Sequence, residues 1–296
     1  MQLQPLPKII TDDLIKQALK EDLGLGGDIT SHAAIDPETR TTYQMAARQT
    51  GVLSGVQMAA DCFKTVDRDL NIKILKRDGE HIERGDVLLV VEGCAVSILT
   101  AERVALNFMG RMCGIATLTA QMVAAVKPHS PLIAATRKTT PLLRAVEKYA
   151  VRCGDGSTHR MRLDDAVMIK DNHIAANGGD IEKTLRRVRD YVGHTIKIEI
   201  EVDNLKQFEE IPSIGIADII MLDNMSCEDM KRAVEMNRGR FILEASGNVN
   251  KDTIQEIAAT GVDVISIGAL THSAPNFDVG LDVAPQRTGV KTASIL

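Results

Sequence analysis

Charged side chains repeatedly follow apolar, strand-length segments in the second half of the chain. The segments are residues 132–135, 166–169, 196–202, 218–222, 241–243 and 262–267, and the polar residues in or just after the first four are Thr136, Arg137, Lys138, Lys170, Glu201 and Asp223. Arginine and lysine bind carboxylate and phosphate groups, and isolated carboxylates bind divalent cations. The mixture predicts a site for a polyanion that is bound together with Mg²⁺.

Two carboxylates in this set are the candidate metal ligands. Glu201 and Asp223 belong to successive predicted strands, so both could hold Mg²⁺ that bridges a phosphorylated substrate. A buried ion pair between Glu201 and a lysine or arginine is an equally good interpretation of the spacing. The histidines form neither an HExxH motif nor a helical pair, which argues against a catalytic zinc site.

Basic residues are dense between positions 103 and 170, although the chain as a whole is acidic. They are Arg103, Arg137, Lys138, Arg144, Lys148, Arg152, His159, Arg160, Arg162 and Lys170. Arg144, Lys148 and Arg152 could form the solvated face of a helix over residues 141–152, paired with Glu147. That explanation does not extend to Arg137, Lys138 and Lys170, because these residues directly follow apolar strands.

Small residues follow the last two apolar segments. Ser246-Gly247-Asn248 follows one, and Ile267-Gly268-Ala269 ends the other. Backbone N–H groups exposed at such strand ends form the usual phosphate site of an α/β barrel. Another glycine-containing turn, Gly154-Asp155-Gly156, has the spacing of neither a dinucleotide-binding nor a P-loop motif.

The elements that position these residues alternate. Helical patterns over residues 226–236 and 250–260 separate the later strands, which predicts βα units and a parallel sheet. Six strands are visible and a seventh could be hidden, so the expected fold is an incomplete six- or seven-stranded parallel α/β barrel. The pattern before it differs, with a short amphipathic helix over 11–22, β-like segments over 42–99 and a long helix over 100–126.

The composition excludes several classes of protein. The 296 residues carry 35 Lys+Arg against 40 Asp+Glu, and this net charge of −5 argues against nucleic-acid or membrane-surface binding. Aromatic residues make up 3% of the chain and tryptophan is absent, so base-stacking surfaces are not expected. The first residues lack the pattern of a signal peptide, and the five cysteines include no CxxC pair. These features predict a cytoplasmic protein with reduced thiols.

Several strings of residues together resemble one enzyme family. They are TAERVALNF (100–108), TRKTTP (136–141), KYAVRCG (148–154), HR (159–160), DAVMIKDNHI (165–174), EIEVDNL (199–205), DIIMLDN (218–224), LEASGN (243–248) and GVDVISIGALTH (261–272). In this order, over essentially the whole chain, they are similar to quinolinate phosphoribosyltransferases, also called carboxylating nicotinate-nucleotide pyrophosphorylases.

The resemblance implies a fold and a reaction. The fold would comprise an N-terminal α/β sandwich domain (residues 1–115, joined by 276–296) and an α/β barrel domain (116–275). The activity would be that of a pentosyltransferase: quinolinate and 5-phosphoribosyl-1-diphosphate give nicotinate mononucleotide, diphosphate and CO₂ in de novo NAD biosynthesis. Mg²⁺ would be required.

The resemblance also implies roles for individual residues. Quinolinate would be surrounded by Arg103, Arg137, His159, Arg160 and Lys170. The catalytic residues would be Lys138, Glu201 and Asp223, which serve the phosphoribosyl diphosphate and its Mg²⁺. The 5-phosphate would contact Ser246, Gly247, Asn248, Ile267, Gly268 and Ala269, and Thr136 would complete the substrate site. The enzyme would be a homodimer, alone or within a hexamer, with Arg103 contributed by the neighbouring subunit.

Four positions depart from the family pattern. The family often has glycine where this chain has Leu142, Asp155 and Asn248, and asparagine where it has Thr158. Three alternatives remain beside the quinolinate enzyme: a molybdenum-transport-associated paralogue, a phosphosugar-binding barrel without activity, and a Schiff-base aldolase that uses Lys170.

Overall fold

The computed structural model describes residues 3–285 and divides the chain into two compact units. One unit contains Arg111–Asn276 together with the first residues of the chain. The other contains Pro7–Gly110 and the segment that begins at Phe277. The predicted domain boundary at residues 115 and 116 stays a prediction, and residues 286–296 of the predicted return segment 276–296 lie outside the described residues.

The unit that begins at Arg111 is built on a parallel sheet of seven strands in the order β7-β6-β12-β11-β10-β9-β8. The strands are β6 (Leu132–Ala135), β7 (Ser157–Thr158), β8 (Val167–Ile169), β9 (Ile198–Val202), β10 (Ile219–Asp223), β11 (Ile242–Ser246) and β12 (Val264–Ser266). The edge strands β7 and β8 follow each other in sequence, and the structure shows no pairing between them over the described residues. The expected incomplete parallel α/β barrel is thus confirmed, and the two-residue β7 is its seventh strand.

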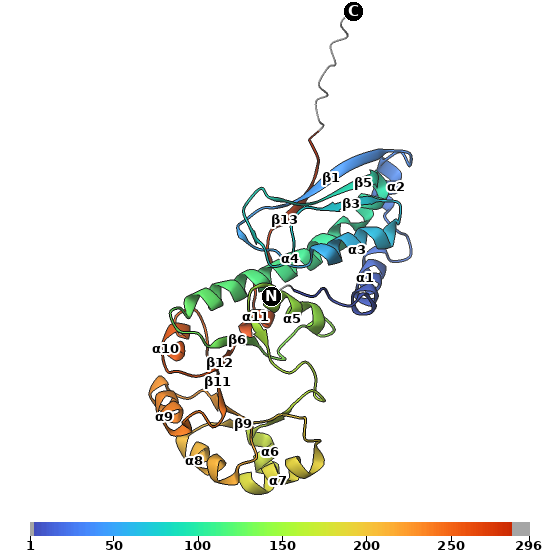
Figure 1. Ribbon diagram of the computed structural model, residues 1–296. Coiled ribbons are helices and arrows are strands. Elements are labelled where there is room, and N and C mark those ends of the chain that lie inside the picture. The colour runs from blue at the N-terminus through green and yellow to red at the C-terminus, as the bar shows by residue number, and fades with distance from the viewer. Residues whose placement is uncertain (1–2, 286–296) are drawn as a thin grey trace, which may run out of the picture. The chain divides into compact units, whose positions relative to one another are not determined.

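Helices cover the outer side of this curled sheet (Figure 1). They are α5 (Arg144–Cys153), α6 (Asp171–Ala176), α7 (Ile181–Tyr191), α8 (Leu205–Ile214), α9 (Cys227–Asn237), α10 (Ile254–Ala258) and α11 (Ala269–His272). Consecutive helices from α6 to α10 contact one another. In β9, Ile198, Ile200 and Val202 are fully buried. Because side chains alternate along a strand, Glu199 and Glu201 share the opposite face.

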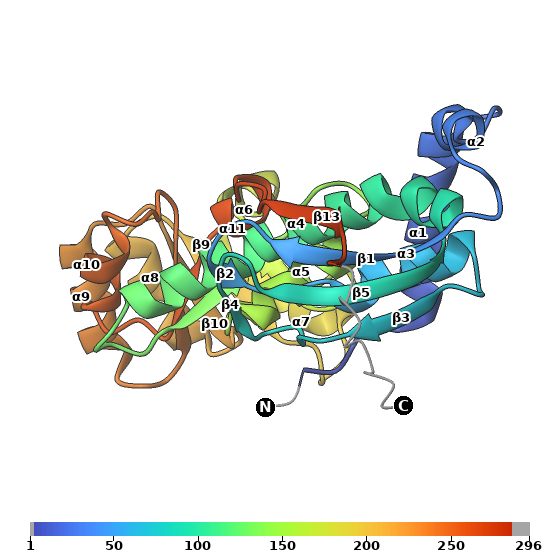
Figure 2. The same ribbon diagram turned by 90° about the horizontal axis from the view of Figure 1, so that it is seen from above.

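The other unit combines an antiparallel sheet with helices. The sheet has the order β13-β1-β5-β3, and a separate ribbon pairs β2 with β4 (Figure 2). The elements are α1 (Lys8–Leu23), α2 (Ile29–Ala34), β1 (Arg40–Ala47), β2 (Gly51–Val52), α3 (Val56–Val66), β3 (Asn71–Ile74), β4 (His81–Ile82), β5 (Val87–Cys94), the part of α4 (Ala95–Ala125) up to Gly110, and β13 (Val279–Val283). The expected N-terminal α/β sandwich is therefore confirmed. Although α4 is 31 residues long, no described helix is both long and apolar enough to cross a membrane.

Several element boundaries differ from the sequence predictions, and three of them are in helices that carry or flank the site. The helix predicted over 100–126 begins at Ala95, and the helix predicted over 141–152 begins at Arg144. The helix predicted over 250–260 shortens to α10, because the Asn250 side chain accepts hydrogen bonds from the amides of Asp252 and Thr253 and forms a turn first. The start of α9 is as expected, since the Ser226 hydroxyl accepts from the Asp229 amide.

The three positions where glycine is replaced all have a left-handed backbone. The φ angles are 68° at Leu142, 61° at Asp155 and 51° at Asn248. Asparagine and aspartate tolerate this region, whereas leucine is strained there. Pro141 and Leu142 are the central residues of a turn closed by the hydrogen bond from the Leu143 amide to the Thr140 carbonyl. When the third residue of such a turn has a positive φ, glycine is the favoured residue at that position.

We expect Leu142→Gly to stabilise the protein by about 1 kcal/mol. Glycine adopts the left-handed backbone conformation without strain, and the substitution removes only an exposed side chain. Leu142 is 81% exposed, so little packing is lost. The melting temperature should rise by about 2–4 °C. Leu163→Gly is the matched control, since Leu163 is 73% exposed and has no left-handed backbone. A melting temperature that falls in Leu142→Gly would contradict the strain argument.

Candidate active site

A cavity of about 500 Å³ opens at the carboxyl ends of the parallel strands. Its lining includes eleven of the fifteen residues that the sequence predicted for the site: Thr136, Arg137, Lys138, His159, Arg160, Lys170, Glu201, Asp223, Ser246, Gly247 and Asn248. Ile267, Gly268 and Ala269 do not line it, although a Cβ on Gly268 would lie 2.9 Å from Cδ of Lys138. Arg103 belongs to the other unit. The roles of these residues toward substrates stay predictions.

Unpaired positive charge lines one side of the cavity. The Arg160 guanidinium donates to the Ala166 carbonyl at 2.9 Å, which fixes its direction. Burial, together with the neighbouring charge of Arg137, lowers the pKa of Arg160. Nε of Arg137 is buried and finds no hydrogen-bond partner among the described residues. Because a buried donor without an acceptor is costly, this side of the cavity is suited to a bound anion.

The carboxylates predicted as metal ligands lie on neighbouring strands. Glu201 on β9 accepts from Nζ of Lys170 at 2.5 Å, so the ion pair that was the alternative interpretation is present. Asp223 ends β10, where its Oδ2 accepts from Nδ2 of the Asn224 side chain at 2.8 Å. Each carboxylate therefore retains oxygen lone pairs for a further ligand. Oxygen donors beside an open cavity fit Mg²⁺, which prefers one or two protein carboxylates and otherwise binds water and phosphate oxygens.

Hydrogen bonds hold the turn that follows β11 against the end of the neighbouring strand β10. The Asn224 amide donates to the Ser246 carbonyl at 2.9 Å, and the Asn248 side chain donates to Oδ1 of Asn224 at 3.1 Å. Gly247 has a φ of 96°, and a Cβ there would overlap the Asn224 side chain. Glycine is thus required both by backbone conformation and by close approach. The turn leaves small, polar groups at the cavity edge, as a phosphate site needs.

A buried polar network forms the floor of the cavity. Nε2 of His159 lies 2.6 Å from Oε2 of Glu199 and 3.8 Å from Oε2 of Glu244, and the Ser266 hydroxyl donates to the other oxygen of Glu244. Nδ1 of His159 accepts from the Arg160 amide at 2.8 Å, so the ring proton donated to Glu199 is on Nε2. The structure therefore places both ring nitrogens of His159 against protein groups.

The ionisation of this network is shared among its members. Burial and the negative charge of Glu199 raise the pKa of Glu244 to about 7. Burial would lower the pKa of His159, but the hydrogen bond and charge of Glu199 raise it. A second ring proton on Nδ1 would break the bond from the Arg160 amide, which opposes that rise. The site thus contains a group that changes charge near neutral pH.

Several residues of the cavity and its supports carried no clear sequence signal. Glu199, Glu244 and Ser266 lie within strands, where alternation does not distinguish an inward carboxylate from a solvated one. The proposed solvated face of the helix over 141–152 is wrong for Lys148, which is 1% exposed. Its neighbour Glu147 is also fully buried and accepts from the Arg111 guanidinium and from Thr140. Residues distant in sequence bury both side chains, so local spacing could not show it.

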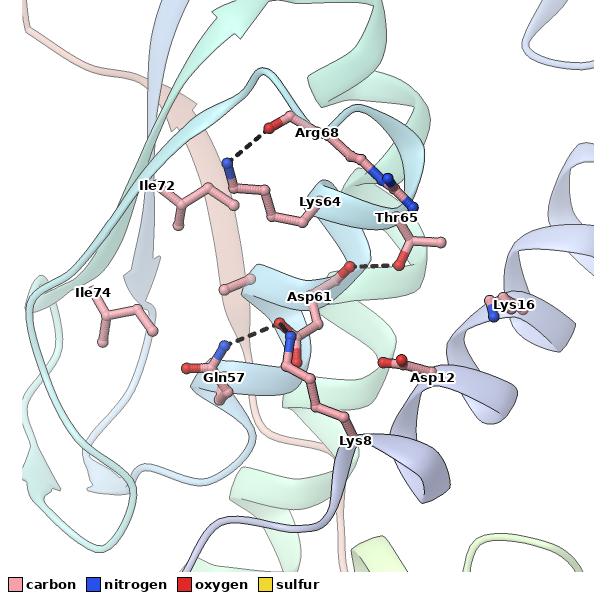
Figure 3. Close-up of a pocket in the computed structure, with 11 residues that line it drawn as sticks. Lys8, Asp12, Lys16, Gln57, Asp61, Lys64, Thr65, Arg68, Ile72 and Ile74 are labelled. Carbon is pink, nitrogen blue, oxygen red and sulfur yellow. Dashed lines mark hydrogen bonds and ion pairs between the residues drawn. The ribbon is translucent and has the colours of Figure 1, made fainter.

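A second cavity, of about 700 Å³, lies in the other unit between α1, α3 and β3 (Figure 3). This cavity also has basic residues, but neighbouring protein groups already pair with two of them. Lys8, whose side chain is 70% exposed, pairs with Asp61 at 3.3 Å, and Gln57 donates to the same oxygen. Lys64 donates to the Arg68 carbonyl. The cavity at the strand ends, with its buried unpaired donor, is the stronger candidate.

Comparison with known proteins identifies two family models that together cover most of the chain. Residues 28–113 match the N-terminal domain of quinolinate phosphoribosyl transferase, and residues 115–282 match its C-terminal domain. The matched regions meet near the boundary between the two structural units.

Individual relatives are similar over nearly their whole length. A probable carboxylating nicotinate-nucleotide pyrophosphorylase of Methanothermobacter thermautotrophicus is 44% identical over 92% of this chain and 98% of its own. The protein of the same description from Bacillus subtilis is 36% identical over 94% and 95%. The crystal structure of NadC from Streptococcus pyogenes superposes with a TM-score of 0.90 at 39% identity, covering 95% of this chain and 100% of that one.

Proposed function

Because the chain belongs to the quinolinate phosphoribosyltransferase family, we propose that it catalyses the family reaction. The enzyme joins quinolinate to 5-phosphoribosyl-1-diphosphate and releases diphosphate and CO₂, with nicotinate mononucleotide as the product. This step belongs to NAD biosynthesis, and we propose that it takes place in the cytoplasm. The five cysteines, all among the described residues, form no disulfide in the structure, which fits that location.

The observation that carries the proposal is the composition of the cavity at the strand ends. Arg137, Arg160 and Lys170 bring three cations to a space that also contains two carboxylates. Both proposed substrates are polyanions, and bringing them together requires fixed cations that cancel their repulsion. The buried, unpaired Nε of Arg137 supports this assignment, because a substrate carboxylate would supply the acceptor that it lacks.

In this proposal, one group of residues binds quinolinate and another binds the phosphoribosyl diphosphate. Arg137, Arg160 and Lys170 hold the two carboxylates of quinolinate and orient its ring nitrogen toward the ribose. Lys138 contacts the phosphoribosyl diphosphate, whose 5-phosphate lies in the turn formed by Ser246, Gly247 and Asn248. Glu201 and Asp223 would hold the Mg²⁺ that accompanies the diphosphate. When bound, the metal neutralises negative charge on the diphosphate leaving group.

Lys170 acts in this proposal as a cation and not as a nucleophile. Its ammonium is paired with Glu201 at 2.5 Å, and a charged ammonium has no lone pair with which to attack a carbonyl carbon. A Schiff-base aldolase that acts on neutral sugars would also have no use for the adjacent arginines.

The proposed reaction can be tested by measuring the CO₂ that it releases. Quinolinate labelled in the 2-carboxylate should release labelled CO₂ only when phosphoribosyl diphosphate and Mg²⁺ are both present, and nicotinate mononucleotide should form in equal amount. A Lys138→Ala variant is the control for contaminating activity. Absence of CO₂ release from folded wild-type protein would instead favour a barrel that binds phosphosugars without turnover.

We further propose that the enzyme is a homodimer whose sites are shared, with dimers able to associate into a hexamer. Arg103 on α4 is exposed and makes no hydrogen bond or salt bridge with any other residue that the structure describes. A role in capping its own helix does not explain it, since α4 begins eight residues earlier, at Ala95. An exposed, unpaired arginine can serve as a cation for the quinolinate site of a neighbouring subunit.

We expect Asp223→Asn to weaken the use of phosphoribosyl diphosphate by about 10- to 100-fold in kcat/KM and to raise the Mg²⁺ concentration required. The amide keeps the size of the side chain but removes the charge that attracts the metal. Quinolinate affinity, measured by calorimetry, should change by less than about twofold. Asp263→Asn at the far end of the sheet is the control. Loss of thermal stability without a change in Mg²⁺ requirement would favour a structural role for Asp223.

A further inference from the structure

Lys148 is buried beneath the quinolinate side of the cavity, although it does not line the cavity itself. The side chain is 1% exposed and extends from α5 to the loop after β7. Its Nζ donates to the carbonyl of His159 at 2.5 Å and to the carbonyl of Arg160 at 2.7 Å. Both carbonyls belong to residues whose side chains enter the cavity.

The ammonium of Lys148 has no carboxylate partner within salt-bridge distance among the described residues. The charged or titratable groups that face it are Arg144 on its own helix, Arg137 after β6, and His159, Arg160 and Asp165 in the loop before β8. Four of these five groups are basic. A buried cation among other cations is costly, and an apolar side chain of the same length would avoid that cost. The charge of Lys148 therefore requires an explanation beyond packing.

We propose that Lys148 is a positioning residue for the dicarboxylate substrate: its ammonium fixes the main chain of His159 and Arg160, so that the Arg160 guanidinium is held in the cavity. This inference rests on the proposed function. Two further contacts fit it, because Arg160 donates to the Ala166 carbonyl and Arg144 donates to the Met161 carbonyl at 3.1 Å. The loop is thus held at successive residues from α5 and from its own far end.

The same burial makes the contact sensitive to pH. Burial, reinforced by the charge of Arg144, lowers the pKa of Lys148 to about 8. Above that pH the ammonium loses its charge, and its hydrogen bonds to the two carbonyls weaken. A bound dicarboxylate adds negative charge nearby and raises the pKa of Lys148. Binding near pH 8 must then take up a proton, because ligand and proton favour each other.

The effect on substrate binding has the opposite sign to the effect on folding. The unfolded chain keeps Lys148 protonated up to its ordinary pKa near 10.5, whereas the folded chain releases the proton near pH 8. Between these values the unfolded state binds more protons, so the contribution of Lys148 to stability rises with pH. Weaker quinolinate binding in this range therefore cannot be attributed to Lys148 destabilising the fold.

The test is calorimetric titration of quinolinate into the intact enzyme at pH 6.5–9.5, in pairs of buffers with different ionisation enthalpies. We expect wild-type affinity to fall about tenfold between pH 7 and pH 9.5, with proton uptake greatest near pH 8. Lys148→Met should bind quinolinate about 10- to 100-fold more weakly at pH 7 and should lose the uptake near pH 8. In turnover, KM for quinolinate should rise more than KM for phosphoribosyl diphosphate.

Two further variants separate positioning from general effects. Lys148→Arg keeps a permanent charge, so it should retain binding at pH 7 better than Lys148→Met and lose the alkaline decline. Arg152→Met, an exposed change on the same helix, should leave affinity and proton uptake unchanged. The inference is wrong if Lys148→Met retains the proton uptake near pH 8. It is also wrong if wild-type enzyme shows no proton uptake near pH 8, and this second result does not depend on whether Lys148→Met folds. Failure of wild-type enzyme to bind quinolinate at any pH would overturn the proposed function as well.

Discussion

Quinolinate should be used at least about 1000-fold better than nicotinate, measured as kcat/KM with saturating phosphoribosyl diphosphate and Mg²⁺. Nicotinate has the same ring and the 3-carboxylate but lacks the 2-carboxylate. Arg137, Arg160 and Lys170 provide more positive charge than one carboxylate can neutralise. A substrate that leaves one of these half-buried cations unpaired loses the contact and also leaves the partial desolvation of that cation uncompensated.

The structure indicates which side chains should carry this discrimination. Arg137 has a buried Nε without a partner, and burial already lowers the pKa of Arg160. Arg160→Met should therefore reduce kcat/KM for quinolinate far more than for nicotinate, which narrows the ratio between the substrates. Lys197→Met is a suitable control, because Lys197 is an exposed residue that pairs with Asp218 at the opposite end of the strands. Equal use of the two substrates by wild-type enzyme would mean that this cluster does not bind a dicarboxylate.

Two inactive variants, Arg103→Ala and Lys138→Ala, should regain activity when their subunits are mixed and allowed to exchange. If Arg103 serves the neighbouring subunit, a mixed dimer has one site with both lesions and one with neither. Random exchange of equal amounts makes about half of the dimers mixed, so about a quarter of wild-type activity should return. Each variant alone should have very little activity, because a charge-assisted contact to a substrate carboxylate contributes about 1.5–3 kcal/mol.

The control for this experiment is a mixture in which both lesions lie on one chain. Wild-type subunits exchanged with the Arg103→Ala/Lys138→Ala double variant form mixed dimers in which each site carries one lesion. These dimers should be almost inactive under the shared-site proposal. Recovery is also expected to follow the rate of subunit exchange, which can be measured independently with labelled subunits. If activity does not recover although subunit exchange is demonstrated, Arg103 acts within its own chain.

Sequence patterns alone were sufficient for the incomplete parallel barrel and for most of the cavity lining, whereas the N-terminal sandwich was implied by the family resemblance. Short apolar runs indicate the strands, and the carboxyl ends of parallel strands lie at the same edge of the sheet regardless of the details of packing. Arg137, Lys170 and Asp223 could therefore be placed together from their positions after three such runs. The departure at Leu142 was visible only through the family resemblance, because the family pattern has glycine there. The structure supplies the physical reason, since the position has a positive φ of 68°.

Only the tertiary structure decided which charged residues are buried and what they contact. Arg144, Glu147 and Lys148 have the spacing of a solvated helix face, yet Glu147 and Lys148 are buried by the Arg111 side chain and by the loop that contains His159 and Arg160. Glu199 and Glu244 are 45 positions apart and meet at His159 only because β9 and β11 curl around the same interior. Local periodicity records which face of an element is apolar, but the partner of a polar side chain is determined by segments distant in the chain.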